Sequence, residues 1–243
     1  MSSPKLSPLV TTGDRAAVPV GQACVFWLGA WMVGQVVATA VGLASGATTI
    51  AEAGPGWLLG VALAGWIPFL VVLYTLGKRY GIGSFGPDWG LTFRPIDLLG
   101  VPIGVVTQLV VLPLLYWPLQ SVWPDTFSET KIQERAKTLF DSASGAGVLL
   151  LVVVVVFGAP LVEELVYRGL LQGAFTRRYH EVASVVLVAL WFAVIHFQPI
   201  ETPGLFVVGL VLGFAALFTR RLGMGVVAHM SFNATGLVLV AMV

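Results

Sequence analysis

The feature that most constrains this chain is the recurrence of windows of roughly twenty residues without any Asp, Glu, Lys or Arg. A helix rises about 1.5 Å per residue, so each window can cross the roughly 30 Å hydrocarbon layer of a bilayer. Of the 243 residues, 57% are hydrophobic and 10% are charged, against about 25% charged in ordinary soluble domains. The sequence therefore predicts an all-α, polytopic transmembrane helix bundle whose first partner is the lipid bilayer.

We predict about seven spans, within a range of six to eight. They cover residues 24–44, 56–76, 98–119, 147–173, 182–198, 204–219 and 223–242. The fifth and sixth spans are short and the loop between them is tight, so this pair could instead form a helical hairpin that does not cross fully. The segment 128–141, SETKIQERAKTLFD, has apolar residues on one helical face and predicts a helix lying on the membrane surface.

Basic residues in the loops predict how the chain is oriented, because Lys and Arg accumulate on the cytoplasmic side of short loops. If the N-terminus is cytoplasmic, that side collects Lys5, Arg15, Lys78, Arg79, Arg94, Arg177, Arg178, Arg220 and Arg221. The opposite side collects Lys131, Arg135 and Lys137. We therefore expect a multi-pass protein of the cell membrane with its N-terminus in the cytoplasm and its C-terminus outside.

Net charge and motifs exclude other classes of protein. The formal net charge of +1 provides no basic field for nucleic acid, and no phosphate loop or dinucleotide glycine pattern lies between a strand and a helix. The many glycines favour close packing of helices within the membrane. We expect no nucleic-acid partner.

Charged residues interrupt the fourth span, in the stretch FGAPLVEELVYRGLL at 157–171. A charged side chain at the bilayer centre costs about 2.5–3.5 kcal/mol on insertion scales, so two adjacent carboxylates there need a reason. Glu164 and Arg168 are four residues apart and can form an ion pair within the helix. Glu163 has no such partner, so it must either be protonated or face polar groups from another helix.

Those polar groups come from two other spans. His196 and His229 each lie within an apolar stretch, and Asn233 shares a helical face with His229. His180, by contrast, follows two arginines and is expected in a solvated loop. Counting residues from the cytoplasmic arginines puts a carboxylate, two imidazoles and an amide at internal depth on three helices.

Pro160 lies just before this polar group in the fourth span. Proline has no backbone N–H, so it removes one helical hydrogen bond. In an α-helix this frees the carbonyl of Val156, and we expect a kink beside the site.

These residues carry a resemblance to a known family. EELVYR, FAVIH and HMSFN resemble the motifs EExxxR, FxxxH and HxxxN of the CPBP family, intramembrane proteases related to the CAAX prenyl endopeptidase and also labelled abortive-infection or bacteriocin-immunity proteins. GLTFRPIDLLGVPIG, at 90–104, resembles the segment that precedes this core. The resemblance is tight over about 157–233 and looser from about 80. It divides the chain into 1–80, a cytoplasmic tail with two spans, and 81–243, the protease-like core.

The resemblance implies an endopeptidase that hydrolyses a peptide bond of a membrane-associated or lipidated substrate, inside the membrane. By position, Glu163 and His196 would activate water, and His229 and Asn233 would stabilise the oxyanion. Glu164, Arg168 and Phe192 would support them. A carboxylate in a dry cavity can act as a general base, and fixed donors stabilise a developing oxyanion. Prenyl-protein cleavage is not transferred with the family name, and the substrate stays unnamed.

Other functions compete with this prediction. Glu163, His196 and His229 could instead bind zinc with an open position for water. We favour a site without metal, because the histidines lie on separate helices and Asn is a poor zinc ligand. A proton-coupled transporter and a non-proteolytic immunity or scaffold protein are the remaining alternatives.

Substrate entry is the last expectation. A peptide must reach the site as an extended strand, through an opening to the cytoplasm or sideways to lipid. From the estimated depths we expect cytoplasmic access.

Overall fold

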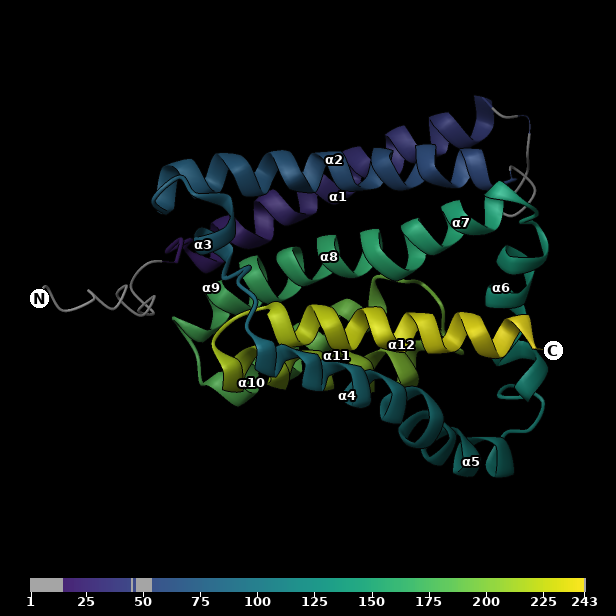
Figure 1. Cartoon of the computed structure of the whole chain (residues 1–243). Helices are drawn as coiled ribbons and strands as arrows, with labels where there is room; N and C mark the ends of the chain where they lie inside the picture. The colour runs from purple at the N-terminus through teal and green to yellow at the C-terminus, as the bar shows by residue number, and fades with distance from the viewer. Residues whose placement is uncertain (1–14, 45, 47–53, 243) are drawn as a thin grey trace, which may run out of the picture.

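The computed structural model describes residues 15–44, 46 and 54–242, and all regular structure in this part of the chain is helical. Six helical segments there are long and apolar enough to cross a membrane. They are α1 (Val20–Ala44), α2 (Gly54–Tyr80), the run from η2 to α5 (Pro95–Val122), the run from α7 to α9 (Ala146–Thr176), α11 (Thr202–Thr219) and α12 (Gly223–Ala241). The chain is a polytopic helical bundle, as predicted (Figure 1).

The helix of the fifth predicted span, 182–198, is shorter than predicted. The helix in this region, α10 (Glu181–Val194), has 14 residues and is therefore only about 21 Å long. The chain turns directly after it, and Phe197 has a positive φ of 52°, a left-handed conformation that ends the helix. α10 packs along α11, and the two form a helical hairpin in which only α11 is long enough to cross by itself.

Two long spans are built from several helical pieces. Pro95–Val122 comprises η2 (Pro95–Leu99), α4 (Gly100–Val106), the π-helical η3 (Thr107–Val111) and α5 (Leu112–Val122). Ala146–Thr176 comprises α7 (Ala146–Val152), the π-helical η4 (Val153–Gly158), α8 (Ala159–Glu163), the π-helical η5 (Glu164–Gln172) and α9 (Gly173–Thr176). Single π-helical turns occur often at functional sites.

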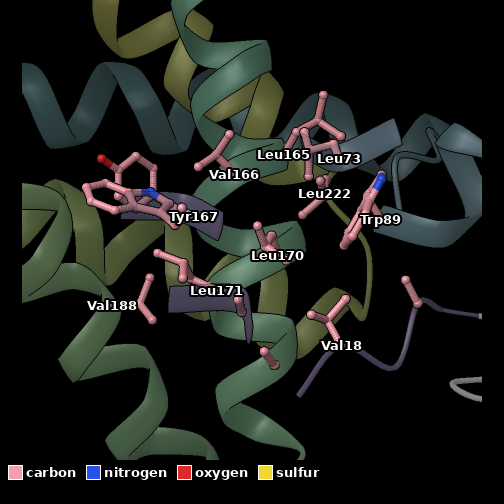
Figure 2. Packing of buried hydrophobic residues seen from close by; sticks show 14 of the residues in the cluster. Val18, Leu73, Trp89, Leu165, Val166, Tyr167, Leu170, Leu171, Val188 and Leu222 are labelled. Carbon is pink, nitrogen blue, oxygen red and sulfur yellow. The ribbon is translucent and has the colours of Figure 1, made fainter. Parts of the chain in front are cut away.

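The largest buried cluster surrounds η5 (Figure 2). Leu170 and Leu171 are almost inaccessible and pack with Trp27 of α1 and Leu73 of α2. The ring of Tyr167 lies against Trp27, with 6.1 Å between ring centroids. This cluster joins the α1–α2 hairpin to the rest of the bundle.

Glycines let α4 approach α12 closely. A Cβ on Gly104 would lie 2.2 Å from the carbonyl oxygen of Ala228, and one on Gly100 would lie 2.6 Å from that of Met224. Helices packed backbone to backbone in this way have little freedom to slide. The contact fixes the position of α12, which carries His229.

One end of the bundle gathers most of the basic residues, and we call it the basic end. Arg177 Nη2 donates to the Arg15 carbonyl over 3.0 Å, and Arg15 Nη2 donates to the Arg220 carbonyl. Burial lowers the pKa of the Arg15 guanidinium, and the charges of Arg177 and Arg220 lower it further. Lys5 lies outside the described residues.

The predicted surface helix is present as α6 (Glu129–Asp141), which begins after Ser128 and carries Lys131 and Lys137. It lies at the end of the bundle opposite α3 (Phe85–Trp89) and α9 (Figure 1). The two groups of basic residues therefore separate as predicted. Which end faces the cytoplasm stays a prediction.

Candidate active site

The two adjacent glutamates have different surroundings. Glu163 is the last residue of α8, and its side chain is 26% exposed, whereas that of Glu164, the first residue of η5, is 0% exposed. Neighbouring residues on a helix are turned by about 100°, so the two carboxylates face different groups. Glu163 meets a polar group from another helix, as expected, because its Oε2 lies 3.7 Å from Nε2 of His229 on α12.

The predicted ion pair between Glu164 and Arg168 is present, with 2.9 Å between Oε1 and Nη1. The same Oε1 also lies 3.2 Å from Nδ1 of His229. The sequence did not predict this second contact. Gly225 makes room for the carboxylate, since a Cβ there would come within 3.0 Å of Glu164 Oε2.

A polar ladder continues along the same helical face and was missed from the sequence. Arg168 Nη2 donates to the Gly209 carbonyl over 3.1 Å, and Gln172 Nε2 donates to the Gly213 carbonyl over 2.9 Å. Both side chains are buried. The spacing 164, 168, 172 was a readable signal, because residues four apart lie on one face.

The ladder depends on a close contact between α10 and α11. A Cβ on Gly209 would lie 3.0 Å from Cα of Ala189, and one on Gly213 would lie 2.8 Å from Cγ1 of Val185. Small residues four apart permit this approach. The backbone carbonyls of α11 are thereby held within reach of Arg168 and Gln172.

Phe192 lies between the two histidines. Its ring centroid is 4.7 Å from that of His196 and 6.2 Å from that of His229. The Arg168 guanidinium carbon lies 4.8 Å from the same ring centroid, a cation–π contact. Phe192 is 1% exposed, so its ring is a fixed wall of the site.

His196 lies outside the helix in which the sequence placed it, in the turn directly after α10. The change follows from the early end of α10. Nδ1 of His196 lies 2.6 Å from the Phe192 carbonyl oxygen. A carbonyl can only accept, so Nδ1 carries the proton and Nε2 is left with a free lone pair.

Asn233 lies one helical turn after His229 and contacts the fourth span. Its Nδ2 donates to the Val155 carbonyl over 2.8 Å. The sequence predicted Val156 as the carbonyl freed by Pro160, on α-helical spacing. Because η4 is π-helical, the carbonyl five residues before Pro160 is the relevant one, and it belongs to Val155.

A cavity of about 200 Å³ brings some of these residues together. Glu163 and His196 line it, together with Trp31 and Gln35 of α1 and Trp66 of α2. His229 and Asn233 lie outside this lining. Apolar walls with a few polar groups are typical of ligand sites.

Residues 145–235 match the family model of type II CAAX prenyl endopeptidase Rce1-like proteins. This segment is therefore similar to the Rce1-like family. The match supports a protease of the CAAX endopeptidase type. No curated protein and no solved structure matches the chain.

The Rce1-like segment contains Glu163, His196, His229 and Asn233, whereas α1 and α2 lie outside it. Half of the cavity wall thus comes from elements that the family model does not cover.

The tautomer of His229 determines which hydrogen bonds its ring can donate or accept at this site. Nδ1 faces the carboxylate of Glu164, so Nδ1 carries a proton. A neutral ring would then offer only a lone pair at Nε2. To donate a hydrogen bond from Nε2 as well, the ring must carry a proton on both nitrogens, with Glu163 beside Nε2 and Glu164 beside Nδ1.

The zinc alternative concerns the distances among Glu163, His196 and His229. In the parts of the chain that the structure describes, no three His, Cys, Asp or Glu side chains come close enough to hold one metal ion. Glu163, His196 and His229 therefore do not form a three-ligand group in this arrangement.

Proposed function

We propose that this chain is an intramembrane endopeptidase that hydrolyses a peptide bond of a membrane-associated substrate. The observation that carries the proposal is that Glu163 and His196 line one cavity within the bundle, with His229 3.7 Å from Glu163. A general base, an imidazole and an apolar cavity that limits water are what hydrolysis within a membrane requires.

In this mechanism Glu163 and His196 activate a water molecule. The water oxygen bonds to the carbonyl carbon while its proton passes to the Glu163 carboxylate or to the free Nε2 of His196. The carbonyl becomes a tetrahedral oxyanion, the C–N bond then breaks, and the stored proton passes to the leaving amine. The second proton of the water stays on the attacking oxygen, so the products are a carboxylic acid and an amine, which become a carboxylate and an ammonium when that proton passes between them, and no further reactant is needed.

His229 and Asn233 would stabilise the oxyanion. His229 does so as an imidazolium that donates from Nε2, with its Nδ1 proton held by Glu164. Asn233 has one amide hydrogen on the Val155 carbonyl and one left for the oxyanion. Glu164 and Arg168 are positioning residues in this scheme, because they act through His229.

The membrane proteome tests the proposal directly. Cells with wild-type protein are compared with cells carrying Glu163→Ala, and the readout is a truncated protein or peptide that appears only with wild type. Glu134→Ala is the matched control, because it removes an exposed carboxylate of α6 far from the site. Equal peptide profiles for wild type and Glu163→Ala would overturn the protease.

The same comparison separates the alternatives. A scaffold or immunity protein would act in cells without any new peptide terminus. A proton-coupled transporter would move protons in reconstituted vesicles and lose this flux in Glu163→Ala. We further propose that the basic end faces the cytoplasm, which places the N-terminus inside and the C-terminus outside.

A further inference from the structure

Gln35 places a polar amide side chain in the middle of a membrane span. The packing of the helices does not explain why a polar residue lies there. It lies nine residues before the end of α1, about 13 Å along the helix. Its side chain is exposed and has no hydrogen-bond partner within the described part of the chain. An amide without a partner in apolar surroundings costs free energy, so a polar residue at this depth points to a function.

Gln35 lines the cavity that contains Glu163 and His196. Its neighbour Gly34 fixes how α1 is rotated, because a Cβ on Gly34 would lie 3.2 Å from the Gly65 carbonyl oxygen. Gly34 and Gly65 also line the cavity. The close contact between α1 and α2 therefore holds Gln35 in the wall of the cavity that Glu163 and His196 also line.

The hydrogen-bonding groups of a glutamine side chain match those of a peptide backbone. It presents one acceptor, Oε1, and two donors on Nε2. A peptide in extended conformation presents an N–H and a C=O of the same residue on the same side. A single amide can therefore pair with both groups, as a neighbouring strand would.

The other groups on this wall complete the subsite. Trp31, Trp66 and Phe69 line the same cavity as Gln35 with aromatic surface, which suits apolar side chains of the bound peptide. We infer that Gln35 and these rings form a substrate subsite, in which the Gln35 amide hydrogen-bonds the backbone of an extended peptide beside the scissile bond. This inference rests on the proposed function, because it takes the ligand to be a peptide substrate.

The test measures peptide binding without turnover. Full-length Glu163→Gln protein in detergent micelles is titrated with acetyl-Leu-Leu-Leu-amide and with the same peptide methylated at its backbone nitrogens. N-methylation removes the donors but keeps the apolar side chains. We expect the unmethylated peptide to bind more tightly, and Gln35→Leu to weaken it about tenfold while changing the methylated peptide less than twofold.

Gln108→Leu is the matched control, since Gln108 is an intramembrane glutamine outside the cavity, beside Gly236. It should leave both affinities unchanged. Gln35→Leu should keep or raise the Tm, because it removes an amide without a partner. Gln35→Met is a second variant of similar length.

The other outcomes of the titrations distinguish failure of the Gln35 inference from failure of the proposed function. If Gln35→Leu weakens both peptides equally, or changes neither while wild-type affinity is retained, Gln35 does not read the backbone and the inference fails alone. If neither peptide binds in any variant with Gln35, the cavity is not a peptide site, and the proposed function fails with it.

Discussion

Glu164 accepts a hydrogen bond from His229 across the contact between η5 and α12, with 3.2 Å between Oε1 and Nδ1. The same oxygen pairs with Arg168. The buried carboxylate therefore both neutralises a guanidinium and sets the tautomer of an imidazole. The motif alone suggests that Glu164 is only structural. In the structure it is connected to the proposed reaction centre through its contact with His229.

The first prediction separates the two glutamates. Glu163→Gln should abolish hydrolysis and leave the amount of folded protein unchanged, because Glu163 is partly exposed and lies 3.7 Å from His229, with no ion pair to Arg or Lys among the described residues. Glu164→Gln should lower folded protein, because it leaves Arg168 without its counter-ion, a change that costs about 3–5 kcal/mol for a buried pair. The amount of folded protein is measured for both variants by size-exclusion chromatography and by unfolding in detergent. An equal loss of folded protein in Glu163→Gln and Glu164→Gln would contradict the separate roles of the two glutamates.

The second prediction separates stability from positioning. The double variant Glu164→Leu with Arg168→Leu should recover much of the stability lost in Glu164→Leu, since apolar residues often replace a buried ion pair without loss. Hydrolysis should not return, because Nδ1 of His229 still lacks its acceptor. A double variant as active as wild type would show that Glu164 only balances Arg168.

Much of this architecture could be predicted from the sequence. Charge-free windows gave the long spans, and the spacing of Glu164 and Arg168 gave their ion pair, because both depend on local helical geometry. The contact of Glu164 with His229 could not be predicted, since it joins residues 65 positions apart and depends on how α12 is rotated.

Local departures from regular α-helix also could not be predicted from the sequence. The π-helical turn at η4 moves the carbonyl freed by Pro160 from Val156 to Val155, which Asn233 contacts, and nothing in the composition of Val153–Gly158 indicates this shift. The end of α10 before His196 is a similar case, since FAVIH is apolar enough to continue as helix. Tertiary packing decides both.

The third prediction concerns the contact that positions α12. Gly104→Ala should destabilise the protein by about 1–3 kcal/mol, as overpacking does, because its Cβ would meet backbone atoms of α12. Gly29→Ala in α1 is the control, since no atom lies within 4 Å of a Cβ there. Thermal unfolding in detergent measures both, and a Gly104→Ala protein as stable as Gly29→Ala would contradict the packing.

The fourth prediction concerns metal. If Glu163 and His196 activate water unaided, activity should survive a membrane-permeant chelator, and purified protein should hold no stoichiometric zinc. Metal content is measured by mass spectrometry and activity before and after stripping. One equivalent of zinc, with activity lost on stripping and restored on its return, would favour the metalloprotease.

The last prediction concerns how a substrate enters, and the packing does not favour the cytoplasmic route expected from the sequence. Trp27, Leu73 and Leu170 lie about one turn from the cavity toward the basic end, and each is at most 1% exposed. This part of the core fills the direct path from that end. Gln35 on the cavity wall is exposed, which places an opening beside α1, toward lipid.

We therefore expect lateral entry, which thiol labelling tests in the full chain with Cys24→Ala. Ile195→Cys, on the cavity wall, should react with N-ethylmaleimide, which crosses membranes, but not with an impermeant maleimide added to either vesicle orientation. Tyr179→Cys is the control, because Tyr179 is 49% exposed at the basic end; it should react with the impermeant reagent in inside-out vesicles only. If the opening faces lipid, a water-soluble maleimide cannot reach the thiol of Ile195→Cys from either side of the membrane. Labelling of Ile195→Cys by the impermeant reagent in inside-out vesicles would restore the cytoplasmic route, and labelling in right-side-out vesicles would place the opening on the outer face.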